Sequence, residues 1–264
     1  KDKDIISVGR TKPPKHCQNQ HIQIKDLDEL YKLDKIEFDK VIFLIGSSNH
    51  HDININIDMG IDFNVYPLNK ALDYFSKRNL KKFICFTTIL LYDQNKLVIP
   101  VDEKQEINPY ANKYIFSKYL SEQTVKFYQN TVPSIIVRLS NIYGYTELRR
   151  PDLIPTIMQD VFEKEKVEIW SNKPKRDFIF TEDAAEAVLK ILNTDFTGIV
   201  NLGSGKMSSL KLISEIIEDL SGKKIISKNQ PVNGPMEFNT NIKRISEVTG
   251  WEPKFDIKKG LEKT

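Results

Sequence analysis

The segment FICFTTILLY, residues 83–92, decides the fold class of this chain. Phe83–Phe86 is a short apolar run of strand-forming residues, which predicts a buried β-strand ending just before Thr87 and Thr88. The next periodic segment, Pro109–Tyr128, has the length and apolar spacing of a helix. A strand followed by a helix is the repeating unit of a parallel sheet, so the same unit is expected elsewhere in the chain.

The same alternation of strands and helices continues in both directions. Further strands are predicted at Ile5–Val8, Val41–Ile45, Ile135–Leu139 and Ile199–Leu202. Further helices are predicted at Asp26–Leu33, Phe63–Lys77, Ala184–Leu192 and Leu210–Leu220. Asp183 and Glu186 have the spacing of a capping box, and Gly222 and Gly250 stand where helix C-terminal caps are expected. The pattern predicts an α/β fold with a parallel sheet covered on both faces.

Composition excludes several classes of protein. The chain has 264 residues, a formal net charge of +3 and basic residues interleaved with acidic ones, so we expect no nucleic-acid partner. No apolar run reaches the ~20 residues that span a bilayer, so we expect no membrane partner. Cys17 and Cys85 form no disulfide framework, which favours reduced thiols in a cytoplasmic protein. His16, Cys17 and His21 have no second ligand pair nearby, so we predict a solvated loop and no metal site.

Small, hydroxyl and amide residues follow the predicted strands. Gly9-Arg10-Thr11-Lys12, Gly46-Ser47-Ser48, Thr87-Thr88 and Ser140-Asn141 each come where one of these strands ends. In an open parallel sheet the ligand lies outside the carboxyl ends of the strands. The sequence therefore predicts a binding cleft at this edge of the sheet.

Tyr114 and Lys118 stand one helical turn apart in the helix that follows Thr88. A phenol is a poor base at neutral pH, because its unperturbed pKa is near 10. A nearby ammonium favours the phenolate, and a threonine hydroxyl could hold a substrate oxygen while the phenol moves its proton. This trio suits hydride transfer at a carbinol carbon. The spacing also arises by chance in many helices, and Tyr110 and Tyr119 would be packing residues.

Six segments together resemble the extended short-chain dehydrogenase/reductase family, in its nucleotide-sugar epimerase/dehydratase branch. They are FICFTTILLY, YIFSKYLSE (114–122), RLSNIYG (138–144), RDFIFTEDAAEAV (176–188), NLGSG (201–205) and TGWEPKFDIKKGLEKT (249–264). The resemblance implies a Rossmann-like doubly wound parallel sheet with a smaller C-terminal substrate domain. It divides the chain into residues 1–144 plus 176–202 for the dinucleotide and 145–175 plus 203–264 for the substrate. It also implies a homodimer formed through helices Phe63–Lys77 and Pro109–Tyr128.

The resemblance assigns roles to single residues. Tyr114 would be the acid/base tyrosine, Lys118 its supporting lysine and ribose ligand, and Thr88 the hydroxyl that bonds the reacting sugar oxygen. Asn141 and Arg176 would contact the diphosphate of a nucleotide sugar, work that suits a planar guanidinium. The remaining cofactor contacts that it implies are Asp26, Leu27, Ile45 and Gly46. As alternatives, Arg176 could form a surface ion pair and Asn141 a turn.

The sequence departs from the family at the dinucleotide turn. The family opens with a strand and a G-x-x-G-x-x-G turn that seats the pyrophosphate. Residues 1–140 hold only Gly9, Gly46 and Gly60, and the first segment resembles the family's second strand. We expect that the first strand and the glycine-rich turn, on the order of 30 residues, are missing from this sequence. The chain as given would then bind its cofactor weakly.

Two further positions narrow the reaction. Dehydratases of this branch carry Asp-Glu after the hydroxyl residue, whereas Ile89 and Leu90 stand here and cannot move protons. Arg10 and Lys12 follow the first strand without an acidic residue, which favours NADP, with NAD as the alternative. The sequence therefore predicts a 4-keto-sugar nucleotide reductase. The alternatives are a 4-epimerase with retained NAD and a catalytically silent dinucleotide-binding subunit.

Overall fold

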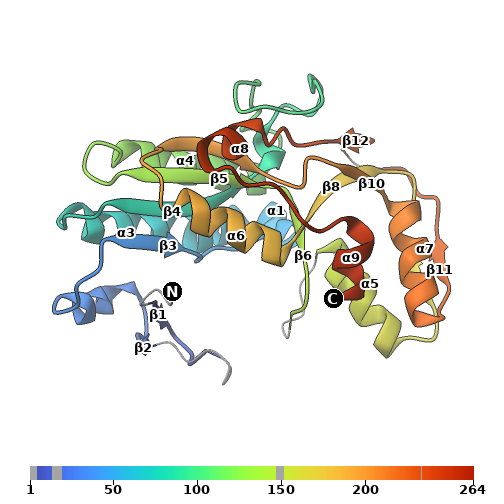
Figure 1. Cartoon of the computed structure of the whole chain (residues 1–264), viewed down its shortest axis with the longest axis horizontal. Coiled ribbons are helices and arrows are strands. Elements are labelled where there is room, and N and C mark those ends of the chain that lie inside the picture. The colour runs from blue at the N-terminus through green and yellow to red at the C-terminus, as the bar shows by residue number, and fades with distance from the viewer. Residues whose placement is uncertain (1–4, 14–19, 147–151, 233) are drawn as a thin grey trace.

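A four-stranded parallel sheet forms the centre of the chain (Figure 1). The computed structural model describes residues 5–13, 20–146, 152–232 and 234–264. The strands lie in the order β3 (Lys40–Phe43), β4 (Lys82–Thr88), β5 (Ser134–Leu139) and β9 (Gly198–Leu202). Cys85 of β4 pairs in register with Phe43 of β3 on one side and with Ile136 of β5 on the other. The predicted α/β class and its parallel sheet are confirmed.

Helices cover both faces of this sheet, as the sequence predicted (Figure 1). One face packs against α3 (Tyr66–Ser76) and α4 (Lys113–Phe127), and the other against α6 (Thr181–Ile191) and α8 (Lys243–Thr249). Successive residues of a strand point to opposite faces, so Phe83 and Cys85 join one apolar cluster and Ile84 joins the other. The apolar runs of the central strands are therefore buried on both sides, as expected for a parallel sheet.

Short helical turns connect β3 to α3. They are α1 (His50–Ile55), α2 (Ile57–Gly60) and the π-helical turn η2 (Ile61–Val65). After β4 the chain makes the 3-10 turn η3 (Ile89–Leu91). The predicted helix at Phe63–Lys77 is present, but its first three residues belong to the π turn. Single π turns occur often at functional sites, because they re-aim side chains within a helix.

A separate parallel pair of strands lies near the N-terminus, below the main sheet in Figure 1. It consists of β1 (Ile6–Gly9) and β2 (Gln20–Gln23), followed by the 3-10 helix η1 (Leu27–Leu33). The predicted α-helix Asp26–Leu33 is thus a 3-10 helix, whose first turn is capped by Asp26. Among the described residues β3 pairs with β4 alone, and Leu44 just beyond β3 is 76% exposed.

The C-terminal half builds a second apolar cluster beside the main sheet. Strand β8 (Lys175–Phe180) pairs with β6 (Asn141–Tyr143), β10 (Met207–Ser209) and β12 (Glu237–Phe238). A smaller pair joins β7 (Val167–Ile169) to β11 (Ile225–Ser227). Helices α5 (Leu153–Glu163), α7 (Leu210–Ser221) and α9 (Ile257–Glu262) pack on these strands. The division of the chain into a dinucleotide domain and a substrate domain stays a prediction.

Two predictions about helix starts are wrong. Helix α4 begins at Lys113, after the cap Asn112, and not at Pro109. Asp183 and Glu186 form no capping box, because α6 already begins at Thr181. Asp183 instead accepts hydrogen bonds from the backbone N–H groups of Lys254 and Phe255, which ties the C-terminal segment to α6.

The left-handed C-terminal caps are present at Gly222 and Gly250, with φ of 71° and 64°.

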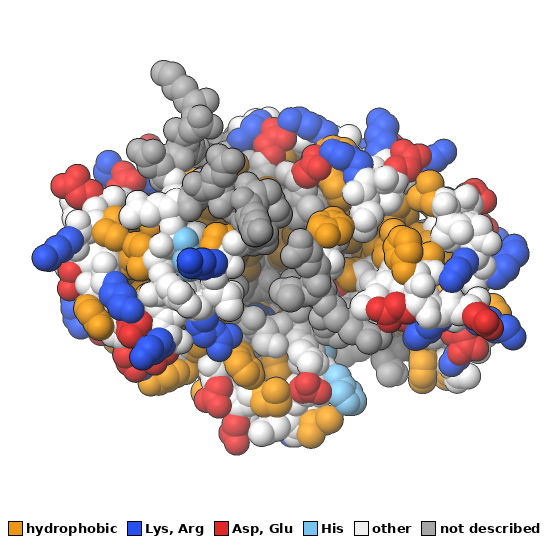
Figure 2. Space-filling model, turned by 90° about the horizontal axis from the view of Figure 1, so that it is seen from below, with side chains coloured by type: hydrophobic (Ala, Val, Ile, Leu, Met, Phe, Trp, Pro, Cys, Tyr) orange, Lys and Arg blue, Asp and Glu red, His pale blue; other side chains and the backbone are white. Residues whose placement is uncertain are grey.

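The surface shows acidic and basic groups side by side. On the face in Figure 2, Lys and Arg side chains stand next to Asp and Glu, and among its described residues neither sign forms a continuous patch. No helix in the described part of the chain combines the length and the apolar character that crossing a bilayer requires. His16 and Cys17 lie outside the described residues. Within the described ranges, no group of three His, Cys, Asp or Glu side chains could hold a metal ion.

Candidate active site

Thr88, Tyr114 and Lys118 come together at the carboxyl end of the main sheet. Thr88 is the last residue of β4, and its hydroxyl accepts the Leu90 N–H at 3.2 Å, so its own proton remains free to donate. Tyr114 lies in the first turn of α4, and the Thr88 hydroxyl is near enough to its phenol to lower the pKa of that phenol. The Lys118 ammonium lies 5.8 Å from the centroid of the Tyr114 ring. All three side chains are buried.

Burial controls the ionisation of the tyrosine and the lysine. Desolvation raises the pKa of Tyr114, the Thr88 hydrogen bond lowers it, and the charge of Asp152 raises it further. Desolvation also lowers the pKa of Lys118 to about 8. The sequence suggested that Lys118 would draw the phenol pKa down, but burial raises that pKa, and Lys118 is not among the groups that shift it. The ammonium bonds to another group.

That other group is Asn64, which sequence reasoning missed. Its Oδ1 accepts the Lys118 ammonium at 3.0 Å and the Ser47 N–H at 2.8 Å. Its Nδ2 donates to the Ser117 hydroxyl at 3.1 Å. Asn64 is buried on η2, so the π turn aims an amide at the site. A single Asn in an amphipathic run gives no periodic signal, and only the position of η2 beside α4 shows its role.

Gly46 lies against the same contact. A Cβ at this position would stand 3.2 Å from Asn64 Oδ1 and 3.5 Å from Lys118 Nζ. A side chain at this position would crowd the Lys118 ammonium. The role of Gly46 as a cofactor contact stays a prediction. Ile45, the other predicted contact at the end of β3, is exposed.

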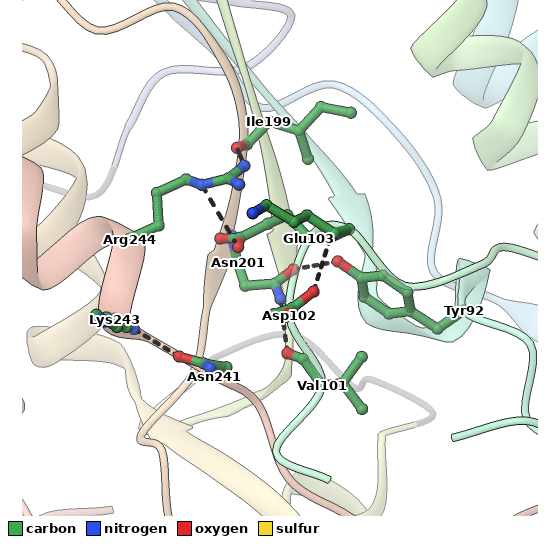
Figure 3. A network of polar contacts seen from close by, with 10 residues as sticks. Tyr92, Val101, Asp102, Glu103, Ile199, Asn201, Asn241, Lys243 and Arg244 are labelled. Atoms are coloured by element: carbon green, nitrogen blue, oxygen red, sulfur yellow. Dashed lines mark hydrogen bonds and ion pairs between the residues drawn. The ribbon is translucent and has the colours of Figure 1, made fainter. Parts of the chain in front are cut away.

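A polar network fixes the turn that carries Thr88 from the other side (Figure 3). Tyr92, which ends η3, donates its hydroxyl to Asn201 Oδ1 at 2.7 Å. Asn201 Nδ2 donates to the Val101 carbonyl at 2.9 Å, and its N–H donates to Glu103 at 2.8 Å. Arg244 of α8 pairs with Glu103 at 3.5 Å. The turn that carries Thr88 is therefore supported by the end of β9, by the segment 93–108 and by α8.

The two predicted diphosphate ligands lie on neighbouring strands of the second sheet. Asn141 of β6 pairs in register with Phe178 of β8. Arg176 lies on β8 as well, two residues before Phe178. Asn141 Nδ2 donates to the Asp177 carbonyl at 2.9 Å. Arg176 donates to the carbonyls of Lys175 and Met236, and burial lowers its pKa. In the described part of the chain it forms no ion pair, so its charge remains available for an anion.

The predicted adenine-side residues lie on the N-terminal strand pair. Arg10 directly follows β1, and both Arg10 and Lys12 are exposed. Asp26 is engaged as the cap of η1, where its carboxylate accepts the Asp28 N–H at 2.8 Å. Leu27 is half-buried in η1. No described contact joins these residues to Thr88, Tyr114 or Lys118.

A parallel sheet covered by helices on both faces, with Thr88 at the end of β4 and Tyr114 and Lys118 on the following helix α4, is the arrangement expected of an NAD(P)-dependent enzyme of the extended short-chain dehydrogenase type. Residues 1–203 match the NAD dependent epimerase/dehydratase family. The chain belongs to that family.

Three relatives show the range of this likeness. A putative UDP-glucose 4-epimerase of Methanocaldococcus jannaschii is 28% identical over 95% of this chain and 83% of its own length. The dTDP-4-dehydro-6-deoxyglucose reductase of Escherichia coli is 28% identical over 91% of this chain and 78% of its own. The solved epimerase Mth375 of Methanothermobacter thermautotrophicus has a TM-score of 0.88 at 18% identity, covering 99% of this chain and 83% of that one. At that identity it shows the Rossmann fold alone.

The described residues near Lys118 suit the ribose in the nicotinamide half of a nicotinamide dinucleotide. Among them the Lys118 ammonium makes one hydrogen bond, to Asn64, so two of its N–H donors remain for ribose hydroxyls. Gly46 leaves space beside it. The sequence contains no G-x-x-G-x-x-G turn to seat the pyrophosphate. The described residues therefore offer donors to a nicotinamide ribose, whereas the sequence has no glycine-rich turn for the pyrophosphate.

Proposed function

We propose that this protein is an NADPH-dependent reductase of 4-keto-sugar nucleotides. One observation carries the proposal: Thr88 and Tyr114 are assembled for proton transfer, but Ile89 and Leu90 follow Thr88. Ile89 is 3% exposed and packs in an apolar cluster with Tyr92. A dehydratase needs an acid and a base to eliminate water, and an isoleucine and a leucine supply neither.

The chain's own residues would handle the proton and the substrate. The bound nicotinamide supplies the hydride to the sugar carbon. Thr88 would donate a hydrogen bond to the keto oxygen, and Tyr114 would give that oxygen its proton. Lys118, with its pKa lowered to about 8 by burial, is largely protonated at neutral pH and would stabilise the phenolate that remains.

Asn141 and Arg176 would hold the diphosphate of the nucleotide. The half-buried Arg176 guanidinium lacks a carboxylate partner among the described residues, and a diphosphate would supply the missing negative charge. With the diphosphate held there, the sugar would lie between Tyr114 and the second sheet.

The free, buried Cys85 thiol fits the cytoplasmic location that the sequence predicts.

A nucleotide-sugar 4-epimerase is the second candidate. The relative from Methanocaldococcus jannaschii, similar along 95% of this chain, is named as a putative UDP-glucose 4-epimerase. The same three residues would serve that reaction, since the proton is removed first and later returned. The two functions differ in whether the cofactor is consumed.

The deciding experiment is to incubate the protein with a 4-keto sugar nucleotide and NADPH while the NADPH absorbance is followed, and then to analyse the products. A reductase consumes one NADPH for each sugar reduced. An epimerase interconverts sugar nucleotides without net consumption of cofactor. If no NADPH is consumed and no sugar nucleotides are interconverted, the catalytically silent alternative is supported.

Cofactor preference gives a separate prediction for Arg10. Arg10 follows β1 directly and is exposed, where the adenosine ribose would lie. A charge-assisted contact to the 2′-phosphate gives roughly a 10- to 100-fold preference. Arg10→Ala should therefore weaken NADPH binding by about that factor and NADH binding much less, and Lys12→Ala should show a smaller loss. Titration of each variant with both cofactors measures this. Equal losses for the two would favour the epimerase.

We further propose a homodimer formed through α3 and α4. The resemblance implies an interface on helices Phe63–Lys77 and Pro109–Tyr128, but the apolar residues Leu68, Leu72 and Phe75 of the first helix pack into the core against the sheet. The exposed apolar groups of this region are Phe63, Tyr66 and Phe127. Large exposed aromatic side chains on neighbouring helical segments suit a protein interface.

The dimer should dissociate when a charge enters this surface. Phe127 is 80% exposed at the end of α4, so Phe127→Glu should leave the fold intact and yield monomers. Phe162, which is 82% exposed on α5, provides the matched control, and Phe162→Glu should remain dimeric. Sedimentation velocity at micromolar concentration measures both. A monomeric unmodified protein would disprove the interface.

A further inference from the structure

Helix α1 directs one face at the catalytic tyrosine. His50 and Asn54 stand four residues apart, so they lie on the same side of this helix. Asn54 Oδ1 accepts the backbone N–H of Tyr114 at 2.9 Å. The imidazole of His50 stacks on the Tyr114 ring, with 3.9 Å between the ring centroids and 16° between the planes. One helix therefore holds both the backbone and the ring of Tyr114.

The imidazole is the outer member of this stack. Tyr114 is 4% exposed and packs with Ile53, Leu91 and Ile115, whereas His50 is exposed. His50 thus covers a ring face that would otherwise meet water. The side of the imidazole that faces Tyr114 is shielded from water although the residue as a whole is exposed, and this desolvation lowers the pKa of His50, so at neutral pH two uncharged rings are stacked.

The first turn of α1 is fixed independently of the stack. Asn49 caps the helix, since its Oδ1 accepts the Asp52 N–H at 3.2 Å and its Nδ2 donates to the Asp52 carboxylate at 2.6 Å. Further along, the Lys113 ammonium donates to the Ile55 carbonyl at 2.8 Å, which ties α1 to the start of α4. His50 is therefore presented to Tyr114 by a turn that is anchored at both ends.

We propose that His50 is a positioning residue for the proton-transferring tyrosine, holding the plane of the Tyr114 ring so that its hydroxyl stays at Thr88. This role rests on the proposed function, in which Tyr114 gives the proton. An aromatic pair of this kind restricts the ring by an energy equivalent to roughly a 2- to 12-fold change in population. Loss of the stack should lower kcat by that factor, because fewer molecules hold the phenol in its reactive orientation.

Steady-state kinetics of three variants test this role. We expect His50→Ala to lower kcat roughly 2- to 12-fold with KM unchanged, and His50→Phe, which keeps a stacking ring, to restore kcat. His51 is exposed on the same helix, so His51→Ala is the matched control and should behave like the unmodified protein. Equal rates for His50→Ala and His51→Ala overturn the proposal. A loss confined to KM, or a failure of His50→Phe to restore kcat, overturns it too.

A second measurement needs no substrate. A ring stacked on Tyr114 shifts the imidazole Hε1 resonance of His50, which is assigned by its loss in His50→Ala. Tyr114→Leu should move that resonance more than the resonance of His51. An unchanged His50 resonance would show that the stack does not form, whatever the enzyme catalyses. If the stack is present but no sugar nucleotide is reduced or epimerised, the proposed function fails and the positioning role fails with it.

Discussion

Tyr114→Phe is expected to lower turnover by ~10²-fold or more, the scale for losing a positioned acid/base group. The change removes one hydroxyl and keeps the ring that packs with Ile53, Leu91 and Ile115. The Thr88 hydroxyl, which lies near the phenol, would still accept the Leu90 N–H. The melting temperature should therefore hardly change. Single-turnover reduction of a 4-keto sugar nucleotide and thermal unfolding measure the two effects.

Tyr119 offers the matched control for this experiment. It lies on the same helix and packs partly buried against the same apolar cluster, but it has no place in the proposed proton transfer. Tyr119→Phe should keep full activity. If Tyr114→Phe retains activity within a few-fold of the unmodified protein, its assignment as the proton donor is wrong.

The central sheet was predictable because its strands bury both faces. Near-continuous apolar runs such as Ile135–Leu139 and Ile199–Leu202 leave few alternatives, and the structure places strands at both. The short strands β6, β7, β10, β11 and β12 have two or three residues each and were not predicted. Such strands carry no periodic signal, since their pairing is decided by tertiary packing.

The candidate site likewise contains residues that the sequence predicted and residues that it did not. Thr88, Tyr114 and Lys118 were predictable because their positions follow from one strand and one helix. Asn64 and His50 were not, because they come from turns whose path depends on how α1 and η2 pack on α4. The raised pKa of Tyr114 was also missed, since burial can only be judged once the surrounding elements are in place.

A buried ion pair one turn beyond Lys118 supports a second large prediction. Glu122 of α4 is fully buried and accepts two hydrogen bonds from Arg138 of β5, at 2.9 Å and 2.8 Å. It also accepts the Thr87 hydroxyl at 2.9 Å. Thr87 and Arg138 face each other in the β4–β5 register, so one carboxylate links α4 to both strands.

Glu122→Leu should lower the free energy of unfolding by ~3–5 kcal/mol, because it leaves the Arg138 guanidinium buried without its partner. Replacing both members, with Glu122→Leu and Arg138→Met together, should restore most of that loss, since two apolar side chains need no compensation. Asp73→Ala provides the control, because its pair with Lys77 is exposed and should matter little. Urea unfolding followed by circular dichroism gives these values.

The double variant also separates stability from site geometry. Glu122 lies one turn after Lys118, and Thr87 is the neighbour of Thr88, so the ion pair ties α4 to the strand that carries the hydroxyl of the proposed active site. If that link sets the distance between Thr88 and Tyr114, the double variant should be stable yet show reduced kcat. A double variant that recovers both stability and kcat would restrict the ion pair to a packing role. A single Glu122→Leu variant as stable as the unmodified protein would contradict the buried pair itself.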